Sequence, residues 1–593
     1  HTTSKGAYVE VLTEAGEKRL IHVPKGKMQV MNSVMKTEWL EVDRKSWQTL
    51  KMIPGNKMVR ITAVEKGSPL YECVTHRRVK KLEDHRLDKL SSRHNADGPR
   101  WIAKATARGE EVDDTPTSAG VVDDMCLKMF RADAAARGRT TAKADVGTAY
   151  ANAKTERGAR YMRCPSTCPE VDDDGTEMVM ALGPPLFGEP QAGFEWATTR
   201  DADLTAAGWA PVENVPCVWY KKGAQSDALL CTVVDDLLFS ESEGYEIIEQ
   251  TVALLRAKYS SVSYEREPTL FAGYKFDTAD EGRTVHVSMP AFIEEKVRMR
   301  APEFLDPQYL EKYLREHGRA ASLQPMADGL ALPKELPSRL TSEQKETQGI
   351  IGDLRYYLKA SPGRLNVIAH RLSTVMACPP KEAGTVARVA LAIAYKHRHE
   401  GVTYSARAAS GELSFRMGFE MPSEEVLSGE ADASWSDRSL IGMVVMFWGG
   451  AVLLETKKAA LADSSTEVEG IASSKCAEHL TVAIEMARGM GYKVDQPTLL
   501  RTDNMSSLRI SNCIKSTARA KHALRRYYVL QERVRRGEIR IEHVPTAQNK
   551  ADYLTKWLSA AKLNESVAAA SGRAHRDAAV PNKQRTEASC SEC

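Results

Sequence analysis

The chain has 593 residues, which is enough for three or four domains with separate cores. With 42% hydrophobic and 27% charged residues its composition is ordinary, and no apolar run is long enough to cross a bilayer. The net charge is only +3, which excludes a global basic excess, so any nucleic-acid surface must come from local basic patches. The 11 cysteines lack the paired spacing of a zinc site, and we expect reduced thiols in an intracellular protein.

The first part of the chain reads as short strands. Residues 1–35 contain the β-like segments AYVEVL and KRLIHV, and we expect a lead-in or the remnant of an upstream domain. Two basic strands are expected at 71–81 and 100–111, with the polar stretch LSSRHNADGP as a loop between them. Residues 121–138 have apolar positions at helical spacing and predict a helix behind a sheet. Asp123 and Asp124 fall at the start of this helix, where they favour its dipole.

Two short apolar segments carry aspartate where a strand usually carries Val or Leu. They are KADVGTAYANA, with Asp145, and LLCTVVDDLLFS, with Asp235 and Asp236. Burying ionised carboxylates without a partner is strongly unfavourable, so these three need a cation or a solvated cleft. A pair of Mg²⁺ ions, which prefer hard oxygen ligands, is the simplest partner. The alternative is a turn or a solvated strand end.

These segments resemble the catalytic motifs of reverse transcriptases of the Ty1/copia retrotransposon class. DVGTAY resembles the first motif, and VVDD resembles the second, usually YVDD, with Val233 in place of the tyrosine. GPPLFGEPQAGFEW resembles the family segment YGLKQAPRLW, with Gly193 in place of the proline. The helical pattern expected over 340–398 resembles a copia segment that retroviral enzymes lack in this form. The resemblance covers about residues 36–560.

The resemblance also implies residues that bind the incoming nucleotide. RWIAKATARG resembles the family strand KARLVARG, so Lys104 and Arg108 are expected to hold the triphosphate. Tyr150 stands where related enzymes exclude a 2′-hydroxyl. Gly188 and Gln191 belong to the segment that approaches the template–nucleotide pair. The alternatives are a solvated basic strand for the cations and an ordinary core position for the tyrosine.

A second set of carboxylates follows from about Ser428. The predicted order of strand, strand, strand, helix, strand, helix, strand, helix is the ribonuclease H arrangement. ADASW, SSTEVEG, RTDN and ADYLTK match the copia series, with Gly470 in place of a tyrosine. The four acidic positions are Asp432, Glu469, Asp503 and Asp552. Taken singly, Glu469 could close a capping box from Thr466, Asp503 could cap a helix, and Asp552 could be surface charge.

Residues 517–537 resemble another copia segment and place several cations on one helical face. We expect a phosphate-binding surface for a hybrid duplex, with a solvated charged face as the alternative. Its residues are Lys521, His522, Arg525 and Arg526, of which His522 would lie near the metals and help the product leave. The Ala/Ser/Arg-rich tail, 561–593, is expected to be disordered.

The fold class that these patterns imply is multidomain, α+β and α/β. It comprises polymerase fingers and palm with an antiparallel sheet (36–275), a largely helical thumb and connection with a Pro-rich loop (276–425), and a ribonuclease H-like mixed sheet (426–560). Since the first residue is His1, we expect a piece of a Pol polyprotein.

The implied activities are RNA-directed DNA polymerase and cleavage of RNA–DNA hybrids, in the service of transposition and DNA integration. Each site would use two Mg²⁺, with Mn²⁺ as an alternative metal. The implied partners are RNA template, DNA primer, hybrid, dNTPs and other polyprotein segments, without a membrane, in a cytoplasmic particle or the nucleus. The alternative is a degenerate element that binds nucleic acid without polymerising.

Overall fold

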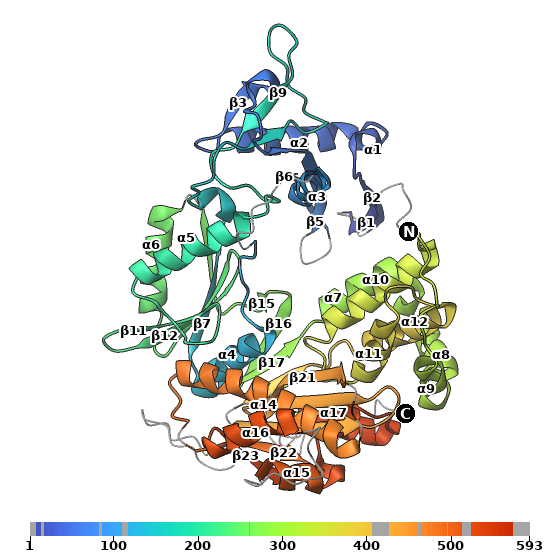
Figure 1. Cartoon of the computed structure of the whole chain (residues 1–593). Coiled ribbons are helices and arrows are strands. Elements are labelled where there is room, and N and C mark those ends of the chain that lie inside the picture. Colours follow the sequence, from blue (N-terminus) through green and yellow to red (C-terminus); the bar gives the residue numbers. More distant parts are fainter. Residues whose placement is uncertain are drawn as a thin grey trace.

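The structure is a computed structural model, and Figure 1 shows how its parts are arranged. In that view the N-terminal elements lie at the top, the central sheet at the left, helices α7–α12 at the right and the C-terminal elements at the bottom. It describes residues 7–13, 17–81, 86–108, 117–259, 261–405, 426–460, 462, 464–494, 496–512 and 524–572.

The N-terminal elements form small sheets and short helices. The strands predicted in AYVEVL and KRLIHV are present and pair as an antiparallel hairpin. Two further sheets are a hairpin of β5 with β6 and a four-stranded sheet in the order β3-β9-β8-β4. Their bounds are β1 Ala7–Leu12, β2 Lys18–Val23, α1 Lys27–Met31, α2 Lys36–Lys51, β3 Lys57–Arg60, β4 Leu70–Tyr71, β5 Cys73–Lys81, β6 Leu87–Ala96, α3 Gly98–Ala107, β8 Tyr161–Arg163 and β9 Met178–Ala181.

Two predictions for this region were wrong. The segment expected to be a loop is strand β6, because its backbone pairs with β5 over its whole length. The second basic strand is helix α3, because Asp97 caps its N-terminus, accepting from the backbone of Arg100, and Pro99 stands in its first turn. The Ala-rich sequence that follows favours a helix over a strand.

The central sheet is antiparallel and has six strands in the order β10-β11-β12-β13-β7-β14. Helix α4 is the helix predicted after Asp123, and Asp123 caps it by accepting from the backbone of Met125. The bounds are α4 Asp124–Arg137, β7 Thr140–Val146, α5 Ala192–Ala206, β10 Ala210–Pro211, β11 Val218–Lys222, β12 Asp227–Val233, β13 Asp236–Glu241, α6 Glu246–Lys258 and β14 Val262–Arg266.

The segment after the central sheet is a hairpin followed by helices, and the helices agree with the largely helical thumb and connection expected over 276–425. The stretch 301–339, expected as a Pro-rich loop, contains two helices, α8 and α9, because Asp306 caps α8 and Pro307 opens it. The bounds are β15 Leu270–Phe271, β16 Tyr274–Ala279, β17 Thr284–Ser288, α7 Pro290–Arg300, α8 Pro307–His317, α9 Ala320–Asp328, α10 Ser342–Tyr357, α11 Asn366–Thr374, α12 Lys381–Lys396 and β18 Val402–Ser405.

The C-terminal sheet has five strands in the order β21-β20-β19-β22-β23. β19 pairs antiparallel with β20 and parallel with β22, so the sheet is mixed, as the expected fold class requires. The bounds are β19 Leu427–Ser434, β20 Leu440–Phe447, β21 Gly450–Lys458, α14 Ser465–Gly489, β22 Thr498–Thr502, α15 Met505–Asn512, α16 Leu524–Arg535, β23 Ile539–His543, the 3₁₀ turn η7 Asp552–Leu554 and α17 Ala560–Ala570.

The prediction of a disordered tail is wrong for its first part. Helix α17 is capped by Ser559, and Val567 and Ala570 are fully buried against the C-terminal sheet. This small apolar face stabilises the helix although the segment has no long apolar period. The remainder of the expected tail lies outside the described residues.

The C-terminal sheet and the central sheet share one hydrophobic core. A single cluster joins α4 and the central sheet to the helices α10–α12 and to β19, β20 and α14. Buried polar contacts cross the same boundary, since Tyr492 donates to Asp133 at 2.7 Å and accepts from Trp448 at 2.9 Å. Within the described part of the chain, no helix is long and apolar enough to cross a membrane.

Two candidate carboxylate sites

The first three predicted carboxylates meet at one end of the central sheet. Asp145 on β7 and Asp236 on β13 are cross-strand partners, which places their side chains next to each other. Asp235 lies in the two-residue turn between β12 and β13, and its carbonyl accepts from the backbone N–H of Val146 at 3.1 Å. The turn considered as an alternative for the Asp pair is therefore present, and it brings Asp235 to Asp145.

Burial and the closeness of the three carboxylates raise the pKa values of Asp235 and Asp236. Burial, Asp235 and Asp145 together raise the pKa of Asp236 to about 6, while Lys143 opposes them. Burial and Asp145 also raise the pKa of Asp235, against the positive charge of Arg93. Like charges at this spacing disfavour ionisation until a cation neutralises them, which fits a group that binds a divalent metal through oxygen ligands.

The residues predicted to bind the nucleotide lie in different elements of the structure. Tyr150 is half-buried beside the carboxylates, and burial and Asp235 raise its pKa. Its ring centroid lies 4.2 Å from that of Phe187. Lys104, by contrast, lies at an exposed position of helix α3, and Arg108 is the exposed residue that directly follows this helix, so neither lies on a strand.

The contacts of Gly188 and Gln191 with neighbouring elements give both residues structural roles. Gly188 has a φ of 91°, and a β-carbon there would meet the carbonyl oxygen of Ala96 at 2.0 Å, so glycine is required for contact with β6. Gln191 is buried and accepts from Arg157 at 3.3 Å within an ion-pair network. Both residues therefore have structural roles within this segment, and their predicted contact with the nucleotide stays a prediction.

Arg93 is a cation that the sequence interpretation missed. It lies on β6, its guanidinium stacks over the Phe187 ring at 4.2 Å, and its charge opposes the rise in the pKa of both Asp235 and Tyr150. The predicted loop, residues 90–99, includes Arg93, and the polar residues of this stretch gave no strand signal.

The Gly193 departure also has a physical reason. A β-carbon at this position would lie 2.9 Å from the carbonyl oxygen of Thr117 and 3.0 Å from the backbone nitrogen of Ala119. The segment before α4 therefore passes too close to α5 for a proline ring. Val233, the other departure, bridges to Val121 of that same segment.

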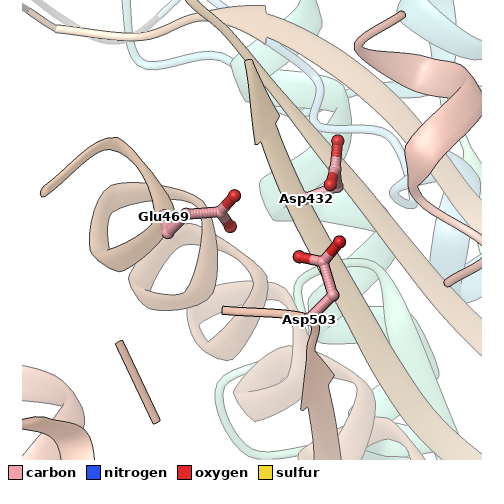
Figure 2. Close-up of side chains that lie close together, drawn as sticks. All are labelled: Asp432, Glu469 and Asp503. Carbon is pink, nitrogen blue, oxygen red and sulfur yellow. The ribbon is translucent and has the colours of Figure 1, made fainter. Parts of the chain in front are cut away.

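Three of the four carboxylates predicted for the second site meet closely. Asp432 on β19, Glu469 on α14 and Asp503 after β22 each offer a ligand atom, and these atoms all lie within 4.8 Å of one another. Figure 2 shows the three side chains converging from two strands and one helix. Among the described residues this is the only group of acidic, histidine or cysteine side chains with that spacing. Asp145, Asp235 and Asp236 are neighbours without being as compact.

The second group fits a divalent cation. Asp432 and Glu469 are buried, and one carboxylate oxygen of Glu469 has no hydrogen-bond partner. Burial, Asp432 and Asp503 raise the pKa of Glu469 to about 9, and burial raises that of Asp432 to about 6. A set of three carboxylates with an unsatisfied buried oxygen matches a hard divalent cation such as Mg²⁺ or Mn²⁺.

Asp552 lies beside this group, and Lys556 links it to Asp432. It sits in the 3₁₀ turn η7 rather than on the predicted helix. Lys556 Nζ donates to Asp552 at 2.6 Å and to Asp432 at 3.3 Å, so one ammonium links the two carboxylates. Lys562 of α17 lies 3.5 Å from the other oxygen of Asp552.

The capping alternatives for two of these residues are wrong. Ser464, and not Thr466, caps α14, accepting from the backbone of Glu467. Asn504, and not Asp503, accepts from the backbone of Ser507 at 2.8 Å at the start of α15. Glu469 and Asp503 therefore have no capping role and face the shared group.

The Gly470 departure places helix α16 against α14. A β-carbon at 470 would lie 2.3 Å from the ring of Tyr527, whose hydroxyl donates to the carbonyl of Thr466 at 2.6 Å. Tyr527 lies on α16, which also carries Arg525 and Arg526. Lys521 and His522 lie outside the described residues.

Comparison with known proteins agrees with the first site. Residues 73–299, which include Asp145, Asp235 and Asp236, match the model of the family described as reverse transcriptase (RNA-dependent DNA polymerase). The chain is 21% identical over 540 residues to the retrovirus-related Pol polyprotein from transposon TNT 1-94 of Nicotiana tabacum, covering 90% of this chain and 38% of that polyprotein. It is 23% identical over 484 residues to the Pol polyprotein from transposon RE1 of Arabidopsis thaliana, covering 79% and 30%.

Solved structures give weaker likenesses. A foamy viral protease-reverse transcriptase in complex with double-stranded DNA has a TM-score of 0.42 at 12% identity, covering 92% of this chain and 73% of that one. Ribonuclease H1 from Halobacterium salinarum has a TM-score of 0.18 at 22% identity, covering 22% of this chain and 93% of that one.

The first carboxylate site and the family match together define a reverse transcriptase domain. Residues 73–299 match the reverse transcriptase family, and most of the chain is similar to Pol polyproteins from plant transposons. The chain spans about a third of the length of the curated polyproteins that it matches.

Proposed function

We propose that the chain copies RNA into DNA at the first site and cuts the RNA strand of the resulting hybrid at the second. The observation that carries the two-site proposal is the compact group of Asp432, Glu469 and Asp503, which stands apart from the carboxylates of the reverse transcriptase domain. Two acidic groups on separate sheets suit two separate reactions on phosphates, because each can hold its own divalent ions.

At the first site, Asp145, Asp235 and Asp236 would hold two Mg²⁺. Such ions lower the pKa of a primer hydroxyl and stabilise charge on the phosphates. The exposed guanidinium of Arg93 binds the triphosphate and is held in direction by the Phe187 ring. Tyr150, packed on the same ring, bounds the sugar pocket and disfavours a 2′-hydroxyl.

At the second site, Asp432, Glu469 and Asp503 would hold two metal ions, with Asp552 beside them. Such ions would supply an activated water and would stabilise the charge on the cleaved phosphate. Lys556 keeps Asp552 next to Asp432, and helix α16 supplies a basic surface for the hybrid backbone. RNA is distinguished by its 2′-hydroxyls and by the groove shape of the hybrid.

A pair of substitutions tests the proposal on an RNA template with a DNA primer and Mg²⁺. Asp235→Asn should abolish primer extension and keep hybrid cleavage, and Asp503→Asn should do the reverse. Asp173→Asn, in an exposed acidic loop, is the matched control and should keep both activities.

If the unchanged chain binds hybrid without extending a primer, the degenerate-element alternative is correct. We further propose that the chain works inside the cell, in a cytoplasmic particle or the nucleus, alongside other segments of its polyprotein. Its expected service to transposition and DNA integration belongs to the same proposal.

A further inference from the structure

The turn that carries Asp235 has an unusual backbone. β12 ends at Val233 and β13 begins at Asp236, so Val234 and Asp235 alone make the reversal. Val234 has a φ of 57°, in the left-handed region that β-branched residues rarely adopt. The conformation of Val234 sets the direction of the two aspartates that follow it, and something must hold it there.

Two buried side chains of helix α5 converge on this turn. Trp196 donates from its indole nitrogen to the carbonyl of Val234 at 2.8 Å, and Arg200 donates from its guanidinium to the same oxygen at 3.0 Å. The two residues are four apart on α5 and therefore lie side by side. Their relative exposures are 0% and 2%, so neither can reach a bound nucleic acid.

Each donor is itself fixed in place. The Trp196 ring packs edge-on against Tyr259 at 5.6 Å within the core between α5, α6 and the central sheet. The Arg200 guanidinium is paired with Asp201, from which it lies 2.7 Å. Because contacts with Tyr259 and Asp201 fix both donor side chains, their N–H groups are held in position to donate to the carbonyl of Val234.

We propose that Trp196 and Arg200 are positioning residues that clamp the Val234 turn in its left-handed conformation and so direct Asp235 and Asp236 toward Asp145. This inference rests on the proposed function of the first site. Neither residue touches substrate or metal; they act through the backbone of the turn. Glycine adopts a positive φ without strain, so a clamp that holds φ becomes less necessary when glycine occupies position 234.

A double-mutant cycle tests the clamp. Arg200→Met removes the guanidinium donor and leaves Asp201, which is 40% exposed, in contact with solvent. We expect Arg200→Met to lower kcat for extension about 10-fold to 100-fold with little change in the KM for dNTP, because misplaced catalytic groups affect the chemical step. In a Val234→Gly chain the same substitution should cost about 3-fold or less.

The indole bond has a matched control. Trp196→Phe removes the donor to Val234, whereas Trp209→Phe removes an indole bond to Thr251, 3.1 Å long, in the same hydrophobic cluster. We expect Trp196→Phe to lower extension several-fold more than Trp209→Phe does. Hybrid cleavage at the second site should stay unchanged in both, which reports that the chain is folded.

Mn²⁺ binding separates failure of the clamp from failure of the proposed function. In chains carrying Asp503→Asn, electron paramagnetic resonance should show that Arg200→Met weakens Mn²⁺ binding at the first site and that Val234→Gly restores it. If the chain binds Mn²⁺ in this pattern but never extends a primer, the proposed function fails and the clamp stands. Equal losses from Arg200→Met with Val234 and with glycine would overturn the clamp.

Discussion

Replacing Glu469 by glutamine should stabilise the protein in the absence of divalent metal. The carboxylate is buried, and burial together with Asp432 and Asp503 raises its pKa to about 9, against an ordinary value of 4.5. At pH 7 the folded chain therefore holds a proton on Glu469 that the unfolded chain releases. At about 1.4 kcal/mol per pH unit, taking up that proton costs about 3 kcal/mol of folding free energy.

The sign of the effect follows from proton linkage. Because the folded state binds more protons, the contribution of Glu469 makes the metal-free protein less stable as pH rises from about 4.5 to about 9. Glu469→Gln removes this dependence. Its stabilising effect should be about 3 kcal/mol at pH 7 and less than about 1 kcal/mol at pH 5.

Hydrogen exchange of peptides from β19 and α14 in the full chain, with EDTA, measures the effect locally. Glu469→Gln should slow exchange in EDTA and remove the extra protection that Mg²⁺ gives the unchanged chain. Glu478→Gln, at an exposed position of the same helix, is the matched control. Faster exchange in Glu469→Gln at pH 7 would refute the electrostatic reasoning, because it would show that the ionised carboxylate stabilises the fold without metal.

Three further predictions concern the same part of the chain. The apparent Mg²⁺ affinity for hybrid cleavage should rise with pH between about 6 and 9, because the metal competes with the proton on Glu469. Titration calorimetry in two buffers should show proton release on Mg²⁺ binding, and an affinity that does not change with pH would contradict this prediction. Gly470→Ala should destabilise the contact with Tyr527 by about 1–3 kcal/mol and reduce hybrid cleavage while sparing extension, and Tyr527→Leu added to it should recover part of the loss. Tyr492→Phe should remove the hydroxyl that donates to Asp133 at the boundary of the two sheets and lower the free energy of unfolding by about 1–3 kcal/mol. Hydrogen exchange at this boundary should become faster, and unchanged exchange would argue against the contact.

The sequence predicted the parts of the fold that depend on local pattern. The helix after Asp123 has helical periodicity and a capping aspartate at its start. The apolar stretch around Asp235, expected as one strand, is the pair of strands β12 and β13, and the turn considered as the alternative lies between them. The predicted loop, residues 90–99, is wrong over 90–96 because polar residues of this kind are typical of a loop, whereas the strand is stabilised by pairing with β5, which is a nonlocal interaction. Capping by Asp97 outweighed the likeness of 100–111 to a family strand.

Some residues of the candidate sites could likewise be predicted from sequence pattern, whereas others depend on nonlocal packing. Spacing along the chain and resemblance were sufficient to select Asp145, Asp235 and Asp236, and the strand register brings them together. The place of Arg93 could not be seen, because it depends on how β6 packs over Phe187. The link from Lys556 to Asp552 likewise depends on a turn that sequence spacing presented as a helix.

The most direct test of the two-site account is to locate the metals. Crystals of the chain grown with an RNA–DNA hybrid and Mn²⁺ would show the ions by anomalous scattering. The account predicts peaks at Asp145, Asp235 and Asp236 and, separately, at Asp432, Glu469 and Asp503. Peaks at only one group, or at neither while the hybrid is bound, would contradict it.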